Sequence, residues 1–176
     1  AVAAVSGDGE VSFLSEGSAV ITATHTSTGL QASVTVTVLP ESAVQYISTP
    51  EELVALDTAP CTVGTLYVLK NDIDMRGVAF DPIGYDGGDA APGDSRKFNS
   101  VFDGNGFAIR NLTISQPEQY NIGLFVYVGA AGNVRNLTLT DMNVTGRIAG
   151  TVAGCNEGEV ENCLIDGYVN GSTVSY

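Results

Sequence analysis

The chain has 176 residues, and its hydrophobic content of 44% is enough to build a core and too high for a disordered polypeptide. Its 20 acidic residues against 7 basic ones give a formal net charge of -13, a field that repels nucleic-acid phosphates and anionic lipids. No apolar run approaches the ~20 residues that a membrane-spanning helix needs. We therefore expect no nucleic-acid partner and no membrane insertion.

The first forty residues predict short antiparallel strands. The stretch 32–38 alternates Ala and Val with Ser and Thr, which is typical of a half-buried strand, and 19–24 alternates in the same way. The connection 25–30 has a glycine near its end and suits a hairpin loop. Through "G-x-A-x-I-x-A" and "A-x-V-x-V-x-V", residues 2–38 resemble the C-terminal half of a bacterial group 2 Ig-like domain. That resemblance implies part of a β-sandwich over residues 1–40, serving as a spacer.

A short helix is predicted after the Ig-like segment. Thr49 is a capping residue, Pro50 suits the first helical position, and Glu51 and Glu52 lie in the first turn. We expect the helix to run to about Leu56 and to cover the open end of the structure that follows, because terminal repeats need such a cover.

The second part of the chain contains an internal repeat. The segment 109–114 recurs at 134–139, an offset of 25, and again at 160–165, an offset of 26. A fixed period predicts stacked coils, and short β-rich runs without helical periodicity predict a β-solenoid. The asparagines of the three copies then share one corner, where buried amides form a ladder along the stack: Asn111, Asn136 and Asn162.

Four asparagines begin formal glycosylation sequons: Asn111, Asn136, Asn143 and Asn170. Because two of them belong to the predicted ladder and would be buried, we do not expect surface glycosylation from these sequons.

The run from "ISTPEELVAL" through "FDGNGFAIRNLTI" to "AGTVAGCNEGEVENCLIDGYVNG" closely resembles the start of GLUG-motif proteins, in collinear order over most of residues 46–171. The segment 149–156 departs from the usual "G-G-L-V-G-x-N" by Thr151 and Cys155. The resemblance implies an extracellular protein of the bacterial cell surface. The expected fold is all-β: the Ig-like part (1–40), then a right-handed β-helix (41–176) with a short capping helix, truncated at its C-terminal end.

Three groups of residues are candidate binding sites. Arg110, Arg135 and Glu161 hold the same position in the three copies, so we expect an outward stripe that either binds acidic sugars or forms an ordinary ion-pair ladder. Tyr85 and Asp86 adjoin a loop over 86–95 and are candidates for ligand contact.

The third group consists of acidic residues that suit either calcium or carboxylate chemistry. Asp141 and Asp166 are 25 residues apart; stacked on adjacent coils they could share a proton, as in a retaining glycosidase, bind Ca²⁺, or be plain turn residues. The turns 71–74 and 103–106 also carry oxygen ligands, without the spacing of the twelve-residue calcium loop. No cofactor other than Ca²⁺ is indicated.

Catalytic and redox motifs are not recognisable. Cys61, Cys155 and Cys163 have no ligand-like spacing and are expected to be buried and unpaired, and His25 is far from any acid–serine partner. The favoured hypothesis is a non-catalytic adhesion or display module that binds glycan or a host surface protein. The alternative is a fragment of a carbohydrate-active β-helix enzyme, a polysaccharide lyase or glycoside hydrolase.

Overall fold

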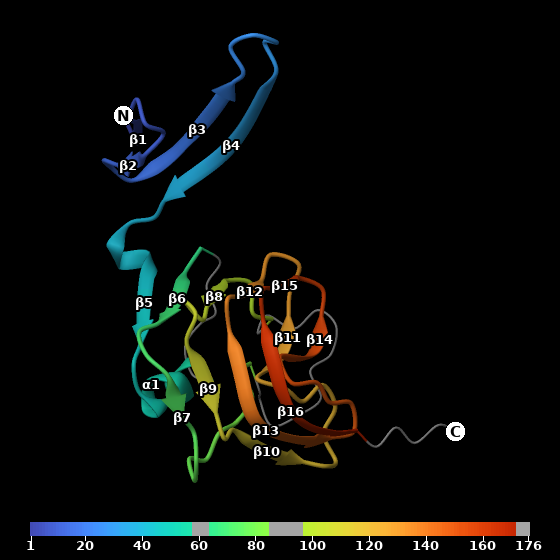
Figure 1. The fold of residues 1–176 in the computed structure, drawn as a ribbon. Helices are drawn as coiled ribbons and strands as arrows, with labels where there is room; N and C mark the ends of the chain where they lie inside the picture. Colours follow the sequence, from blue (N-terminus) through green and yellow to red (C-terminus); the bar gives the residue numbers. More distant parts are fainter. Residues whose placement is uncertain (58–63, 85–96, 172–176) are drawn as a thin grey trace. The chain divides into compact units, whose positions relative to one another are not determined.

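The computed structural model describes residues 1–57, 64–84 and 97–171 and consists mainly of β-strands (Figure 1). One five-residue α-helix and two 3-10 turns are the helical elements of the described ranges. The predicted all-β class is therefore confirmed for this part of the chain. The chain divides into two compact units, Ala1–Val44 and Gln45–Tyr176.

The first unit contains two antiparallel strand pairs. Its strands are β1 (Ala3–Val5), β2 (Val11–Phe13), β3 (Gly17–Thr24) and β4 (Gln31–Val38). β1 pairs with β2, and β3 pairs with β4 along their full length. The predicted hairpin is therefore confirmed. None of the residues 1–40 is fully buried, so the two strand pairs cover each other only in part.

The chain passes from the first unit into a capped end of the second. The 3-10 turn η1 (Glu41–Ala43) leads into β5 (Val44–Ile47), which is followed by helix α1 (Pro50–Val54) and the 3-10 turn η2 (Ala55–Asp57). The Thr49 hydroxyl accepts a hydrogen bond from the Glu52 N–H, and the Glu52 carboxylate accepts one from the Thr49 N–H, which is a complete capping box. Leu53 is fully buried in the core, so the predicted helix and its cap are confirmed.

The remaining strands form three sheets. They are β6 (Leu66–Leu69), β7 (Ile73–Asp74), β8 (Val101–Asp103), β9 (Ala108–Arg110), β10 (Thr113–Gln116), β11 (Phe125–Val128), β12 (Asn133–Arg135), β13 (Thr138–Gly146), β14 (Ala153–Asn156), β15 (Glu159–Glu161) and β16 (Leu164–Gly171). The first sheet has the order β15-β12-β8-β6-β5. The second has the order β10-β13-β9-β7 with β16 also on β13, and the third pairs β11 with β14.

The chain passes through the sheets repeatedly in the same order, and we call each pass a coil; in the described ranges, the first and fourth coils contribute strands to the first two sheets only. The first coil contains β6 and β7, the second β8 to β11, the third β12 to β14, and the fourth β15 and β16. Strands of adjacent coils pair in parallel, as Figure 1 shows for β9, β13 and β16. Equivalent residues therefore form columns that run from coil to coil.

The inward columns make up the core. In the first sheet one column runs from Tyr67 through Phe102 and Val134 to Val160. The first three are at most 1% exposed, whereas Val160, in the fourth coil, is 38% exposed. The same change from buried to exposed occurs at Ile165 and Val169, so the fourth coil is uncovered on one side within the described residues.

The predicted alignment of the first repeat copy is wrong by one sheet. Ile109 pairs with Leu139 in the second sheet, while Val134 pairs with Phe102 in the first. The similarity between 109–114 and 134–139 reflects two different corners that share the sequence Arg-Asn-Leu-Thr. The alignment of the later copies agrees with the structure, since Val134 pairs with Val160.

The corners share a backbone conformation that selects Asn and Asp. Every described non-glycine residue with positive φ is one of these two types: Asn105, Asn111, Asn121, Asn136, Asp141 and Asn162, with φ between 51° and 58°. Asn and Asp tolerate the left-handed region better than other non-glycine residues. The asparagines between strands thus serve primarily to turn the chain.

Candidate functional site

The outer surface of the first sheet carries a charged column whose centre is Asp103. Asp103, Arg135 and Glu161 lie opposite one another on β8, β12 and β15. Arg135 Nε donates to Asp103 Oδ2 at 2.8 Å, and the Asn136 amide donates to Asp103 Oδ1 at 3.1 Å. The Asn105 N–H also donates to Oδ1, at 2.8 Å. Asp103 therefore links its own corner to that of the next coil.

The environment of Asp103 stabilises its charged form. Partial burial of the carboxylate opposes ionisation, but hydrogen bonds from Asn136, Arg135 and the Asn105 N–H outweigh it and lower the pKa of Asp103. The carboxylate is thus ionised at neutral pH and fully engaged within the protein. The sequence analysis places Asp103 only in the turn 103–106, as an oxygen ligand that suits calcium.

Arg110 does not belong to this column, so the predicted stripe of Arg110, Arg135 and Glu161 is wrong for its first member. Arg110 lies on β9 in the second sheet, opposite Thr140. Its guanidinium donates to Asp72 Oδ2 at 2.7 Å, and this hydrogen bond lowers the pKa of Asp72. The ion pair is about half exposed, so its net contribution to stability is small.

The asparagine ladder has a different third member from the one predicted. The Asn162 amide donates to Asn136 Oδ1 at 3.4 Å, and Asn136 donates onward to Asp103. Asn111 lies outside this ladder and donates to Asp74 Oδ1 at 2.8 Å. Its hydrogen bond lowers the pKa of Asp74. Nor are these side chains buried as predicted, since Asn111 and Asn136 are half-buried and Asn162 is exposed.

Asp141 and Asp166 lie in the same region of β13 and β16. Leu139 pairs with Ile165 and Met142 with Gly167, so β13 has one more residue than β16 between these pairs. This bulge contains Asp141, whose positive φ of 55° is equivalent to that of Asn111 on the preceding coil. Asp141 raises the pKa of nearby Arg110 but less than Asp72 does.

The structure offers no closed metal site in the described ranges. No group of three or more His, Cys, Asp or Glu side chains converges there. Asn133 donates its amide to both Glu159 (3.0 Å) and Glu161 (3.1 Å), so these two carboxylates meet at an amide nitrogen. The proposed calcium ligands Asp72, Asp74 and Asp103 are hydrogen-bonded to Arg and Asn side chains instead.

A second polar cluster covers the third sheet. Lys97 Nζ lies 3.1 Å from Glu157 Oε2 and 4.0 Å from the centre of the Tyr127 ring. Hydrogen bonds from Tyr127 and Lys97 lower the pKa of Glu157. Tyr127 pairs with Cys155 across β11 and β14. Sequence analysis does not reveal this cluster, because Lys97 and Glu157 are 60 residues apart and lie outside the repeat copies.

The remaining candidates are Tyr85 and Asp86, the three cysteines and His25. Tyr85 and Asp86 lie outside the described residues, as does Cys61. Cys155 and Cys163 are free thiols. The predicted burial of Cys163 holds only in part, because the fourth coil is uncovered. His25 is exposed and bonds to the hydroxyls of Ser27 and Thr28, within its own hairpin loop.

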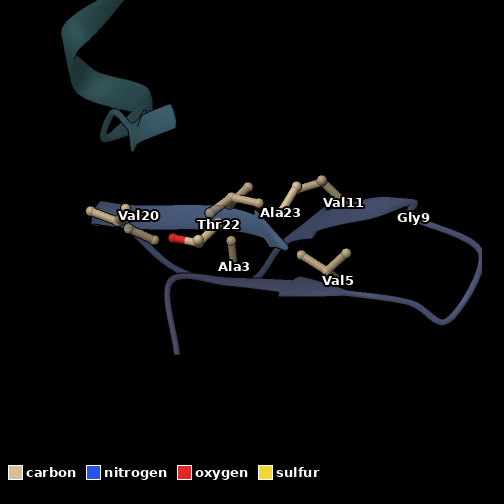
Figure 2. Close-up of a pocket in the computed structure, with 9 residues that line it drawn as sticks. Ala3, Val5, Gly9, Val11, Val20, Thr22 and Ala23 are labelled. Atoms are coloured by element: carbon tan, nitrogen blue, oxygen red, sulfur yellow. The ribbon is translucent and has the colours of Figure 1, made fainter. Parts of the chain in front are cut away.

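The first unit contains an open apolar hollow of about 410 Å³ (Figure 2). Ala3 and Val5 on β1 lie across it from Thr22 and Ala23 on β3. No charged side chain lines the hollow, and the hydroxyl of Thr22 is the one polar side-chain group among its lining residues, so little is present there to orient a small ligand.

Two known proteins are similar to part of this chain. Halomucin of Haloquadratum walsbyi is 30% identical over 126 residues, which are 69% of this chain and 1% of halomucin. A protein of Evansella cellulosilytica described as a Gly-rich membrane protein is 30% identical over 113 residues, 58% of this chain and 12% of that protein. The chain thus spans only a small fraction of either relative.

No known family profile and no solved structure matches the chain. Among the described residues, no helix has the length and apolar character to cross a membrane.

Proposed function

We propose that the chain is a non-catalytic adhesion or display segment of an extracellular bacterial surface protein. In this proposal, residues 41–176 form the first coils of a right-handed β-helix of the GLUG type, and residues 1–40 are part of an Ig-like spacer. The segment presents its outer surface to a glycan or a host surface protein.

The β-helix is supported by the repeated order of the sheets. Strands of successive coils add to the same sheets, and the pairings of β10 with β13, β11 with β14, β12 with β15 and β13 with β16 are all parallel. Parallel strands joined by a crossover are almost always connected in the right-handed sense. The capping helix, the left-handed Asn corners and the inward apolar columns fit the same architecture.

Surface location is supported by the relatives and by charge. One relative is named halomucin and the other is described as a membrane protein, and neither name is that of an enzyme. A net charge of -13 keeps an exported protein soluble and disfavours phosphate-rich partners.

The observation that carries the non-catalytic proposal is the way in which charged outer residues are used. Asp72 binds Arg110, Asp103 binds Arg135, and Lys97 binds Glu157. Each pair joins residues at least 32 positions apart in the sequence. A polysaccharide lyase needs an arginine and a base that are free to contact the sugar, whereas here both candidate arginines are held by aspartates of the preceding coil.

The test is a binding screen combined with product analysis. The chain 1–176 is applied to an array of glycans and extracellular matrix proteins, and every bound polysaccharide is then incubated with it and analysed for new reducing or unsaturated ends. We expect binding without new ends. New ends that increase with protein concentration would establish the enzyme alternative, and no binding to any immobilised glycan or protein would refute adhesion.

A variant refines the binding screen. Replacing Tyr85 and Asp86 by alanine should weaken binding if the segment 86–95, which the sequence predicts to be a loop, contacts the ligand. Replacing Glu41 and Gln45 by alanine provides the matched control, because both are exposed and lie in a different region of the sequence.

A further inference from the structure

The structure separates the four sequons into different environments. Asn111 and Asn136 are half-buried at corners with positive φ, and their amide nitrogens donate to Asp74 and Asp103. Asn136 also accepts from Asn162, so both ends of its amide are bonded. A sugar on either nitrogen would have to fit between adjacent coils. The sequon of Asn170 includes Ser172, which lies outside the described residues.

Asn143 differs from Asn111 and Asn136 in its backbone conformation, its exposure and its hydrogen bonding. It lies within β13 in regular pairing with Thr113 on β10 and Tyr168 on β16. Its side chain is exposed, and no hydrogen bond engages its amide within the described ranges. Its backbone N–H donates a hydrogen bond of 2.9 Å to the Leu112 carbonyl.

The rest of the sequon is arranged as an accessible acceptor. Val144 points into the core and is fully buried, so Asn143 and Thr145 both project outward, because alternate residues of a strand share a face. The neighbouring column positions are the small Thr113 and the 63% exposed Tyr168. Adjacent strands are ~4.8 Å apart, which places the Tyr168 ring within reach of a first sugar on Asn143.

We propose that Asn143 is an N-glycosylation site of this protein. The donor is a polyprenyl-pyrophosphate-linked oligosaccharide, used by a membrane-bound transferase during export, before β13 is paired. The amide nitrogen of Asn143 attacks C1 of the first sugar, so a C–N bond forms as the C–O bond to pyrophosphate breaks. The polyprenyl pyrophosphate leaves with the bonding electrons, and the amide nitrogen loses one proton.

The proposal depends on the extracellular location proposed above, but its test does not. The chain 1–176 is secreted from a eukaryotic host whose transferase requires only Asn-x-Ser/Thr. All sequons are then available in the unfolded chain, and the folded, secreted fraction is analysed by glycopeptide mass mapping. Because the host supplies export, the experiment can succeed even if the adhesion proposal fails.

We expect a glycan on Asn143 and none on Asn111 or Asn136 in the folded fraction. Thr145→Ala should abolish the modification, whereas Ser115→Ala, which removes the hydroxyl opposite Thr145 on β10, should leave it unchanged. The urea midpoint of the glycosylated chain should equal that of the chain trimmed to one sugar. An unmodified Asn143, a glycan on Asn111 or Asn136 in folded protein, or a lowered midpoint would each overturn the proposal.

Discussion

The Asn136 side-chain amide donates a hydrogen bond of 3.1 Å to Asp103 Oδ1, and this bond joins the corner of one coil to the strand end of the preceding coil. The same carboxylate accepts from Arg135 through its other oxygen. One aspartate thus connects two consecutive residues of the adjacent coil, and the stability of this link can be tested by mutation.

Asn136→Ala should lower the free energy of unfolding more than Arg135→Ala does. The Asn136→Ala variant loses the hydrogen bonds to Asp103 and Asn162, one of them to a charged group, at a cost of about 1–3 kcal/mol. Arg135 loses a partly exposed ion pair, typically worth less than about 1 kcal/mol. Urea unfolding curves of both variants provide the measurement, and a costlier Arg135→Ala would contradict this assignment.

Asn136→Gly separates the two roles of the residue. Glycine adopts the positive φ of 51° without strain but lacks the amide. If the hydrogen bonds dominate, Asn136→Gly should be nearly as destabilising as Asn136→Ala; recovery of most of the wild-type stability would show that backbone conformation dominates.

The stability of the second unit should decrease at acidic pH in a way that depends on Asp103. Its pKa is lowered in the folded protein, so the stabilisation is fully present above the unfolded value of about 3.9 and is lost as pH falls through the lower folded value. We expect the free energy of unfolding of Asp103→Asn to depend less steeply on pH below about 4 than that of wild type.

The free energy of unfolding of Asp103→Asn should still decrease at acidic pH, because the pKa values of Asp72, Asp74 and Glu157 are also lowered. Urea curves at a series of pH values from neutral to strongly acidic test this. If the free energy of unfolding depends on pH equally steeply in the variant and in wild type, Asp103 does not stabilise the fold through its charge.

Gly104→Ala should be strongly destabilising. A Cβ on Gly104 would lie 2.5 Å from the Asn136 carbonyl oxygen and 2.5 Å from the Leu137 Cα, both backbone atoms of the next coil. The coils would have to separate locally, and overpacking of this kind costs about 1–3 kcal/mol or more. Gly171→Ala is the matched control, because its Cβ would meet no atom closer than 3.6 Å. Equal thermal midpoints for the two variants would show that the coils are less tightly apposed than described.

Cys163 should react slowly with thiol reagents in the native protein. Burial raises its pKa, which reduces the reactive thiolate, and its sulfur lies 3.3 Å from the Glu161 carbonyl oxygen. In a variant whose other two cysteines are replaced by serine, labelling should accelerate when urea unfolds the chain. Native labelling as fast as that of the unfolded chain would place Cys163 outside the stack.

We also expect no disulfide between Cys155 and Cys163. Non-reducing peptide mapping of the oxidised wild-type protein tests this directly, and a peptide that links the two would refute it.

Features set by local sequence were predictable. Alternation of apolar and polar residues identified β3 and β4, and Thr49 followed by Pro50 and Glu52 identified the capped helix. The stacking of Val134 on Val160 was also predictable because those two copies occupy the same corner.

Features that depend on which sheet the chain enters after a corner were not predictable. The copy that begins at Ile109 resembles the copy that begins at Val134, since a strand that ends in Arg-Asn turns the same way at either corner. Similarity along the chain therefore identified a type of turn but could not identify the sheet, and Arg110 was assigned to the wrong column. Asp103 was not predicted as a member of the asparagine ladder. The ladder continues from the Asn136 amide to the Asp103 carboxylate, and a search for repeated asparagines does not reveal an aspartate.

The order of charges in the first sheet has a consequence for folding. Asp103, Arg135 and Glu161 alternate in sign from one coil to the next. If β15 paired directly with β8 and skipped β12, Glu161 would face Asp103, and like charges directly opposite each other are destabilising. The apolar columns alone would tolerate this error, because Val160 could pack on Phe102 much as it does on Val134. The alternating charges therefore favour pairing of β15 with β12 over pairing with β8. The outward side chains, and not only the core, thus favour the correct order of the coils.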